Sequence, residues 1–388
     1  MNPLIARPQD AAAPLPRLSD PGMLRLRDVH RAASELRRGT PVLLTGETSL
    51  VLLPAETAGA AGLAELQALA TGPVVLLLAP VRAAAVLRRP VAPSMAALAL
   101  RTAPALLTPE VLLGLADPTA EQMLTDDPVQ APECPALAPA ALALAKLARL
   151  LPAVLAAPVK ADAVARAAAM QLMVVAADAV LEYPAVIAAG LRRVAEVKVP
   201  LEGASDARLV AFRAPDSGIE HMAILIGRPE TDPAPLVRVH SECFTGDLLG
   251  SLRCDCGPQL RGAIQRMAKE GAGVLLYLAQ EGRGIGLMNK LRAYAMQDRG
   301  LDTLDANRAL GWGADERNFL VAATMLRELG ISSVRLLTNN PDKVAVLKAS
   351  GLVEVAREAH EFEPNGVNDH YLATKAMRFG HLLDFTQR

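Results

Sequence analysis

The segment RVHSECFTGDLLGSLRCDCGPQL, residues 238–260, places Cys243, Cys254 and Cys256 in a C-x10-C-x-C pattern directly after an apolar run. In a reduced compartment, clustered cysteines bind metal more often than they form disulfides. Thiolates suit Zn2+, and a catalytic zinc site leaves one of its four positions to water whereas a structural site fills all four with protein. Three cysteines therefore indicate catalytic zinc. The alternatives are a structural site completed by His240, or three free thiols in a glycine-rich loop.

A second glycine-rich segment follows the next expected strand. Residues 273–279, GVLLYLA, predict a buried strand, QEGRGIG at 280–286 predicts a turn, and a helix is expected over 286–298. Glycine lets the backbone approach a ligand closely, and a helix N-terminus favours anions. Arg283 adds a guanidinium group suited to phosphate. Because the pattern is neither G-x-G-x-x-G nor a P-loop, an ordinary strand-to-helix turn is the alternative.

The sequence Thr338-Asn339-Asn340-Pro341 predicts a helix start, since Asn and Pro favour the first positions of helices. Lys343 lies one turn further on, so these residues are also candidates for binding an anion. Around these motifs, short strands alternate with helices, which predicts an α/β fold with an antiparallel beginning. The expected strands are 208–213, 221–226, 236–240 and 333–337, and the expected helices are 258–269, 316–329 and 341–350.

The first half has a different composition. Its first 182 residues contain no Phe, Tyr or Trp, and Ala, Leu, Val, Pro and Arg dominate it. We expect two domains, residues 1–190 and 191–388, each a mixed α/β fold, with a join near 184–206. In the first domain we expect a helix at 25–38, strands at 41–46, 49–54 and 74–80, and helical stretches at 137–157 and 162–180.

Overall composition excludes several classes. The 388 residues carry a formal net charge of −1, so no general basic field attracts nucleic acid or acidic membranes. The uncharged run at 66–81, interrupted by Gly72 and Pro73, is shorter than the roughly 18 residues of a spanning helix. Residues 1–10 lack the pattern of a signal peptide, and four cysteines do not make a disulfide scaffold. We expect a soluble cytoplasmic protein that binds neither nucleic acid nor membranes.

Five motifs together resemble GTP cyclohydrolase II. They are RVHSECFTGDLLGSLRCDCGPQL, YLAQEGRGIGLMNKLRAYAMQD, LDTLDANRALGWGADERNF, VRLLTNNPDKV and NDHYLATKAMRFGH, in this order over roughly 193–388. The resemblance implies an enzyme that opens the imidazole ring of GTP in the first committed step of riboflavin synthesis. It would release formate and pyrophosphate and leave a diaminopyrimidinone ribosyl monophosphate. It also implies a homodimer and one Zn2+ per chain. Mg2+ with the GTP triphosphate is expected on general grounds.

The resemblance assigns roles residue by residue. It places the zinc ligands at Cys243, Cys254 and Cys256. The positions that it matches to nucleotide contacts are Arg238, Val239, His240, Ser241, Glu242, Gln259, Glu281, Gly282, Arg283, Thr303, Thr338 and Lys343.

Three further residues match catalytic positions of that family. Tyr294 falls beside the zinc-bound water, Asp315 at the proton acceptor, and Arg317 at the proposed nucleophile for the α-phosphate. Because a guanidinium group stays protonated at ordinary pH, electrostatic stabilisation by Arg317 is an alternative. Alternatives for the whole protein are a catalytically silent GTP-binding regulator and a cyclohydrolase variant serving another pathway.

In the first half, RAASELRRGTPVLLTG at 31–46 resembles the beginning of dihydroxybutanone phosphate synthase, which is often fused ahead of cyclohydrolase II. That family continues with a dense acidic run that holds metal. Here only Glu47 and then Glu56 follow, and a rearranged site using Asp126 and Asp127 is the alternative. We therefore expect a degenerate, non-catalytic domain that serves for structure or docking, and cyclohydrolase chemistry that remains detectable without it.

Overall fold

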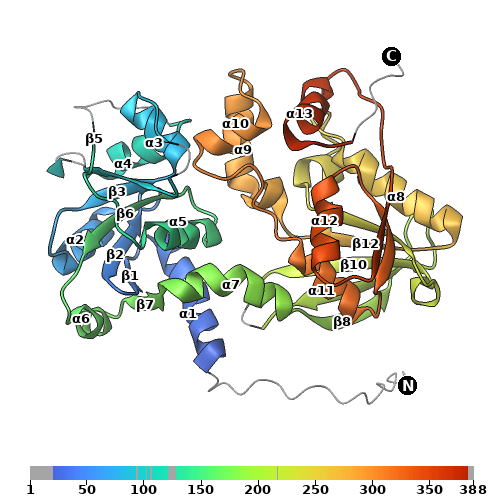
Figure 1. Cartoon of the computed structure of the whole chain (residues 1–388), viewed down its shortest axis with the longest axis horizontal. Coiled ribbons are helices and arrows are strands. Elements are labelled where there is room, and N and C mark those ends of the chain that lie inside the picture. The colour runs from blue at the N-terminus through green and yellow to red at the C-terminus, as the bar shows by residue number, and fades with distance from the viewer. Residues whose placement is uncertain are drawn as a thin grey trace.

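The computed structural model describes residues 21–382 except 93–94, 102, 105–106, 121–127 and 216. Each half of the chain builds one mixed sheet flanked by helices, as Figure 1 shows. The predicted α/β class is confirmed for both halves. Among the described residues, no helix combines the length and the apolar character needed to cross a bilayer.

The first sheet has the order β5-β4-β3-β6-β2-β1-β7, and its pairs are antiparallel except β1 with β7. Its central strands are apolar on both faces because helices cover them. The strands are β1 (Val42–Thr45), β2 (Ser49–Pro54), β3 (Val75–Leu78), β4 (Leu98–Arg101), β5 (Val129–Gln130), β6 (Ala153–Pro158) and β7 (Met173–Ala176). The helices are α1 (Pro21–Arg38), α2 (Ala60–Leu69), α3 (Pro80–Leu87), α4 (Pro109–Ala116), α5 (Ala138–Leu147) and α6 (Ala163–Ala169).

The second sheet has the order β14-β13-β11-β12-β10-β9-β8; β8, β9, β10 and β12 run antiparallel in succession, and the remaining pairs are parallel. The antiparallel beginning is thus confirmed. The strands are β8 (Arg192–Lys198), β9 (Arg208–Arg213), β10 (Glu220–Gly227), β11 (Leu236–Ser241), β12 (Ala272–Leu278), β13 (Ser333–Leu337) and β14 (Glu354–Glu358). The helices are α7 (Ala177–Ala189), α8 (Cys256–Glu270), α9 (Leu287–Gln297), α10 (Thr303–Ala309), α11 (Leu320–Glu328), α12 (Pro341–Ala349) and α13 (Asp369–Phe379), with short turns η2 (Pro229–Thr231), η3 (Phe244–Leu248) and η4 (Glu281–Gly284).

One expectation for the first half was wrong. The stretches 137–157 and 162–180 are not continuous helices, because Ala153–Pro158 forms β6 and Met173–Ala176 forms β7. A strand buried on both faces has no alternation of apolar and polar residues, so an Ala-rich run does not distinguish it from a buried helix. The expected join at 184–206 contains the end of α7, which continues through Pro184 to Ala189, and the whole of β8, and the boundary between the two domains stays a prediction.

The two halves share a hydrophobic core. Helices α9 and α10 (orange in Figure 1) lie between the two sheets, and their inner side chains pack with leucines of the first half. Trp312, 4% exposed, belongs to this shared core together with Met296 and Leu310. Ala293 and Met296 of α9 and Ala306 of α10 are therefore buried against the first half.

Candidate active site

Three adjacent parallel strands end at the same edge of the second sheet and bring the predicted motifs together. Strand β11 lies between β13 and β12. Cys243 follows β11, Glu281 follows β12, and Thr338 follows β13. Because the carboxyl ends of parallel strands meet at one edge, segments distant in the sequence line one pocket.

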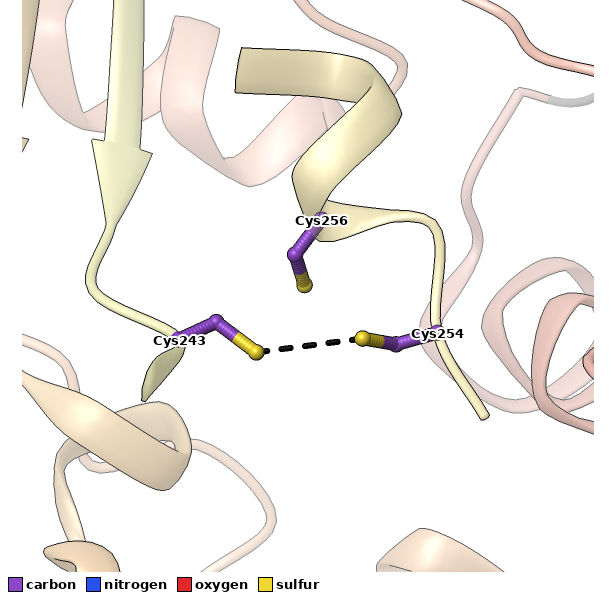
Figure 2. A group of neighbouring side chains, drawn as sticks. All are labelled: Cys243, Cys254 and Cys256. Carbon is purple, nitrogen blue, oxygen red and sulfur yellow. Dashed lines mark hydrogen bonds between the residues drawn. The ribbon is translucent and has the colours of Figure 1, made fainter. Parts of the chain in front are cut away.

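The three cysteine side chains converge at this edge, as Figure 2 shows. Their sulfur atoms all lie within 4.8 Å of one another, and the Cys243 and Cys254 sulfurs are 3.8 Å apart. Hydrogen bonds from Cys254 and Cys256, and then the Lys290 ammonium, lower the pKa of Cys243. Three converging sulfurs with one thiol biased toward thiolate can hold a metal ion.

A one-turn π-helix, η3, wraps these cysteines between β11 and α8. Gly246 lies inside it, and a Cβ atom there would come within 2.7 Å of the Cys254 sulfur and 3.0 Å of the Cys243 sulfur. Only glycine lets the backbone approach the sulfurs this closely.

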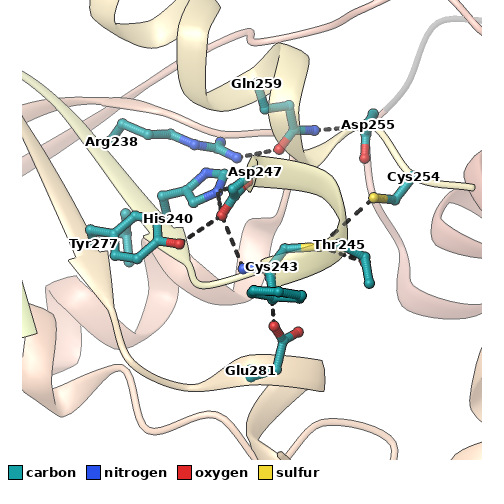
Figure 3. Close-up of polar contacts among 12 residues, drawn as sticks. Arg238, His240, Cys243, Thr245, Asp247, Cys254, Asp255, Gln259, Tyr277 and Glu281 are labelled. Atoms are coloured by element: carbon teal, nitrogen blue, oxygen red, sulfur yellow. Dashed lines mark hydrogen bonds and ion pairs between the residues drawn. The ribbon is translucent and has the colours of Figure 1, made fainter. Parts of the chain in front are cut away.

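His240 does not complete the cysteine group. Figure 3 shows its imidazole Nε2 facing Asp247, whose carboxylate oxygen lies 3.1 Å away. The same carboxylate accepts hydrogen bonds from the Tyr277 hydroxyl at 3.0 Å and from the Cys243 backbone N–H at 2.9 Å. Among the described residues, the metal-donor group contains only the three cysteines. The geometry therefore favours the arrangement with an open fourth position.

Lys290, which our sequence reasoning did not single out, connects several parts of the pocket. Its ammonium lies 3.2 Å from the Cys243 sulfur, 2.9 Å from the Thr245 hydroxyl and 2.8 Å from Glu281. Burial alone would lower the pKa of Lys290, but the Cys243 thiolate and Glu281 raise it on balance. Tyr294 lies one turn further along α9, and its hydroxyl is 3.2 Å from the Thr245 hydroxyl.

The turn after β12 has a strained backbone. Gly282 and Arg283 both adopt left-handed conformations, with φ of 63° and 62°. For Arg283 this conformation is costly and is held by its surroundings, where its guanidinium stacks 3.7 Å from the centre of the Phe379 ring. The Arg283 Nη1 atom is buried without a hydrogen-bond partner within the described part of the chain. Orphaned donors of this kind indicate that a ligand completes the site.

Further cations line the opposite side of the pocket. Burial lowers the pKa of Arg238 to about 10, and its Nε is also buried without a partner among the described residues. Burial, and then Arg238 and Arg317, hold the pKa of Lys343 well below its usual value. The Lys343 ammonium donates to the Val239 carbonyl at 2.8 Å. An anion placed among these groups would relieve their mutual repulsion.

Asp315 and Arg317 form an ion pair at the start of the segment before α11. Arg317 lines the pocket, whereas Asp315 contacts it through the Arg317 guanidinium. Burial alone would raise the pKa of Asp315, but the hydrogen bond from Arg317 lowers it on balance. Asp315 is therefore an ionised acceptor at neutral pH.

The C-terminal helix α13 closes the remaining side. Lys375 donates to Asp255 at 2.5 Å, and Tyr371 and His381 also line the pocket. The motif NDHYLATKAMRFGH forms this helix, and the sequence alone does not predict that it lies beside the pocket.

The comparisons with known proteins agree with this site. Residues 192–359 match the family model described as GTP cyclohydrolase II. The GTP cyclohydrolase-2 of Pasteurella multocida is 50% identical over 201 residues, which cover 52% of this chain and 91% of that protein. The GTP cyclohydrolase-2 of Yersinia pseudotuberculosis is 53% identical over 193 residues, which cover 50% of this chain and 98% of that protein. That of Azospirillum brasilense is 56% identical over 246 residues, covering 63% of this chain and 64% of that protein.

The chain belongs to the GTP cyclohydrolase II family. The predicted family resemblance of the second half is thereby confirmed, and the chain is an enzyme of this class.

Solved structures of 3,4-dihydroxy-2-butanone 4-phosphate synthases also match the chain, at low sequence identity. A two-domain 3,4-dihydroxy-2-butanone 4-phosphate synthase, RibBX from A. baumannii, is 18% identical, covers 80% of this chain and 93% of its own, and has a TM-score of 0.33. The 3,4-dihydroxy-2-butanone 4-phosphate synthase of Candida albicans is 17% identical and has a TM-score of 0.31. The match covers 40% of this chain and 96% of that protein. Likeness at this level establishes neither an activity nor a site for the first half.

Most positions that the sequence matched to GTP cyclohydrolase II roles line the single pocket described here. Val239 and Asp315 are exceptions that contact pocket residues instead. The lining positions are Arg238, His240, Ser241, Glu242, Cys243, Cys254, Cys256, Gln259, Glu281, Gly282, Arg283, Tyr294, Thr303, Arg317, Thr338 and Lys343.

Proposed function

We propose that this protein hydrolyses GTP with zinc, opens the imidazole ring, and releases formate and pyrophosphate to give a diaminopyrimidinone ribosyl monophosphate for riboflavin synthesis. The observation that carries the proposal is the presence, in one pocket, of three converging cysteine sulfurs and a group of buried cations. The first suits a metal ion, and the second suits a polyphosphate.

The donor set fits zinc. Cys243, Cys254 and Cys256 would hold the ion, because thiolates are its preferred ligands and the open position suits a catalytic site. When bound, zinc supplies the Lewis acid that makes water nucleophilic near neutral pH. The hydrogen bond from the Cys243 N–H to Asp247 fixes the direction of the first ligand.

The triphosphate is assigned to the cationic side of the pocket. Arg238 and Lys343 are buried and Arg283 is partly buried, and both arginines carry a buried donor without a partner in the described structure. An anionic ligand would satisfy these donors and raise the pKa of Lys343 by offsetting the nearby positive charges. We also propose that Mg2+ accompanies the triphosphate, because phosphoryl transfer generally requires its charge to be neutralised.

Tyr294 is assigned to the ring-opening step. Burial raises the pKa of its hydroxyl, so the phenol keeps its proton at neutral pH and can donate a hydrogen bond. It lies beside Thr245 and Lys290, on the same side as the cysteine group. Its position suits a hydrogen-bond donor to the ring nitrogen beside the guanine carbon under attack, which takes up a proton when its bond to that carbon breaks.

Arg317 is assigned to pyrophosphate release. Its guanidinium is held by Asp315 and stacks over the Phe319 ring at 4.9 Å. We favour the electrostatic role, because a guanidinium group carries its charge at all ordinary pH and is a poor nucleophile in that form. We also propose a cytoplasmic homodimer, as the family resemblance implies.

The test is turnover of GTP by the purified full-length chain with zinc and Mg2+. We expect formate, pyrophosphate and the diaminopyrimidinone product in equal amounts, measured together by chromatography and a formate assay. A regulator that retained the fold without turnover would bind GTP and release no formate. A variant serving another pathway would retain the formyl group, giving pyrophosphate without formate. Either result would overturn the proposal.

A further inference from the structure

Helix α9 contacts the pocket with one face and the first half of the chain with another. Lys290 and Tyr294 are four residues apart, so they share the face toward the cysteine group. Asn289 and Arg292 are three residues apart and face the first half of the chain instead. Helix α9, which carries the candidate proton donor Tyr294, is therefore bound on its opposite face by residues of the first half.

Arg292 is held between two carboxylates of the first half. Its Nη2 lies 2.7 Å from Glu56, and its Nε lies 2.8 Å from Asp117. All three side chains are less than one fifth exposed. Glu56 is itself fixed, because its second oxygen accepts a hydrogen bond from the Leu151 N–H at 2.7 Å. This triad spans more than two hundred residues of sequence and is shielded from water.

A second contact lies on the same helix face. The Asn289 amide donates to the Arg149 carbonyl at 3.1 Å, and its oxygen accepts from Arg292 at 2.8 Å. The aliphatic part of the Arg149 side chain also lies against Gly286, where a Cβ atom would meet its Cδ at 3.3 Å. The N-terminal end of α9 is thus positioned by side chain and backbone together.

The segment that carries Arg317 is held in a similar way. Glu316 lies between Asp315 and Arg317 in the sequence, and its carboxylate pairs with Lys146 of α5 at 2.5 Å. The same oxygen accepts from the Gly313 N–H at 2.6 Å. Glu316 also donates its N–H to the Arg283 carbonyl at 3.0 Å. One lysine of the first half therefore fixes a turn that joins two candidate phosphate-binding arginines.

We propose that the first half is a positioning scaffold for catalysis, acting through Glu56 on Arg292 and through Lys146 on Glu316. These are positioning residues, since none of them lines the pocket. Each holds an element whose other side carries a candidate catalytic group, Tyr294 in one case and Arg317 in the other. Small displacements of such groups are costly for the rate. The inference rests on the proposed function of the pocket.

The experiment uses the full chain with Glu56→Gln and Lys146→Met, and measures kcat, KM for GTP and bound zinc. Glu35→Gln is the matched control, because Glu35 forms an exposed ion pair within α1 of the same half. We expect kcat to fall by about tenfold in each test variant, with a smaller change in KM and unchanged zinc content. The control should match the wild type, and Lys146→Arg should restore most of the rate.

Two results would overturn the inference. One is a wild-type kcat in both test variants. The other is a parallel loss of kcat, zinc and thermal stability, which would mean that the contacts only support folding. If either variant is insoluble, Glu56→Asp and Lys146→Gln give the same comparison, and Lys146→Arg remains the variant that keeps the charge. A wild-type chain that releases no formate from GTP would instead contradict the proposed function itself.

Discussion

Tyr294 and Lys290 approach the cysteine group from the same face of α9, and each contacts Thr245 through a polar atom. Lys290 carries a charge close to the Cys243 sulfur and so favours its thiolate. Tyr294 carries a proton that burial retains. Lys290 therefore stabilises the charge on the sulfur, and Tyr294 donates a hydrogen bond.

Replacing Tyr294 with Phe separates these roles. Tyr294→Phe removes a hydroxyl and leaves the ring, so zinc content and GTP affinity should stay at wild-type levels. We expect formate release to slow by about 10²–10⁴-fold, the range for general acid–base groups. Stopped-flow and steady-state formate assays measure this change. An unaltered rate would show that Tyr294 only packs.

A histidine outside the pocket gives a prediction on pH. Burial, and then Arg149, lower the pKa of His221 to about 4, and its Nδ1 accepts from the Ala279 N–H. The unfolded chain binds this proton below about pH 6.5, whereas the folded chain does not until about pH 4. The stability from neutral His221 is therefore present above pH 6.5 and lost as pH falls toward 4, on the order of 3 kcal/mol in all.

Between pH 6.5 and 4, the free energy of unfolding of the His221→Gln variant should fall less than that of the wild type. Urea unfolding at pH 7.5, 6, 5 and 4 measures the difference, and any loss of metal on acidification is common to both proteins. Equal pH dependence of the two proteins would contradict the assignment.

At the scale of elements, the π-helix η3 sets the geometry of the cysteine group. Gly246→Ala would press a methyl group against the sulfurs. We expect zinc affinity to fall by about tenfold or more, the usual effect of disturbing the support of a metal ligand. Competition with a chelating dye measures it. Gly218→Ala is the control, because nothing lies within 4 Å of its Cβ position; wild-type zinc affinity in Gly246→Ala would contradict the close fit.

The elements also show what sequence can predict. In the second half, strands and helices appear near the expected residues because turn residues such as Gly271, in a left-handed conformation after α8, mark their ends. In the first half, residues 131–189 contain no glycine to mark the ends of elements, so the Ala-rich run at 137–157 predicts a helix where β6 forms. Lys290 and Tyr371 went unassigned because a lone lysine or tyrosine in a helix has no distinguishing pattern. Their contacts arise only from tertiary packing.

At the scale of the whole molecule, the described residues of the first half contain no group of three or more His, Cys, Asp or Glu side chains that could hold a metal ion. Glu56, one of the two acids expected after β1, is committed to Arg292 and to the Leu151 N–H. Glu47 lies exposed in the turn between β1 and β2. The other candidates, Asp126 and Asp127, lie outside the described residues.

We therefore expect no dihydroxybutanone phosphate synthase activity. The full chain with Mg2+ should leave ribulose 5-phosphate unchanged, because hard cations need several oxygen ligands converging at one point. Conversion of ribulose 5-phosphate by the wild-type chain, abolished in Glu47→Gln, would contradict this expectation. Removal of residues 1–190 would expose Trp312, Met296 and their neighbours, so the truncated chain should be less soluble while cyclohydrolase chemistry remains detectable.

Zinc dependence of the reaction is tested by titrating the metal-free chain with zinc and following formate release from GTP. We expect the rate to rise linearly and to level off at about one zinc per chain. We expect no rise for Cys254→Ser, because a hydroxyl is a far weaker zinc ligand than a thiolate. Full turnover without zinc, or stoichiometric zinc with full turnover in Cys254→Ser, would show that these cysteines do not hold a catalytic zinc ion.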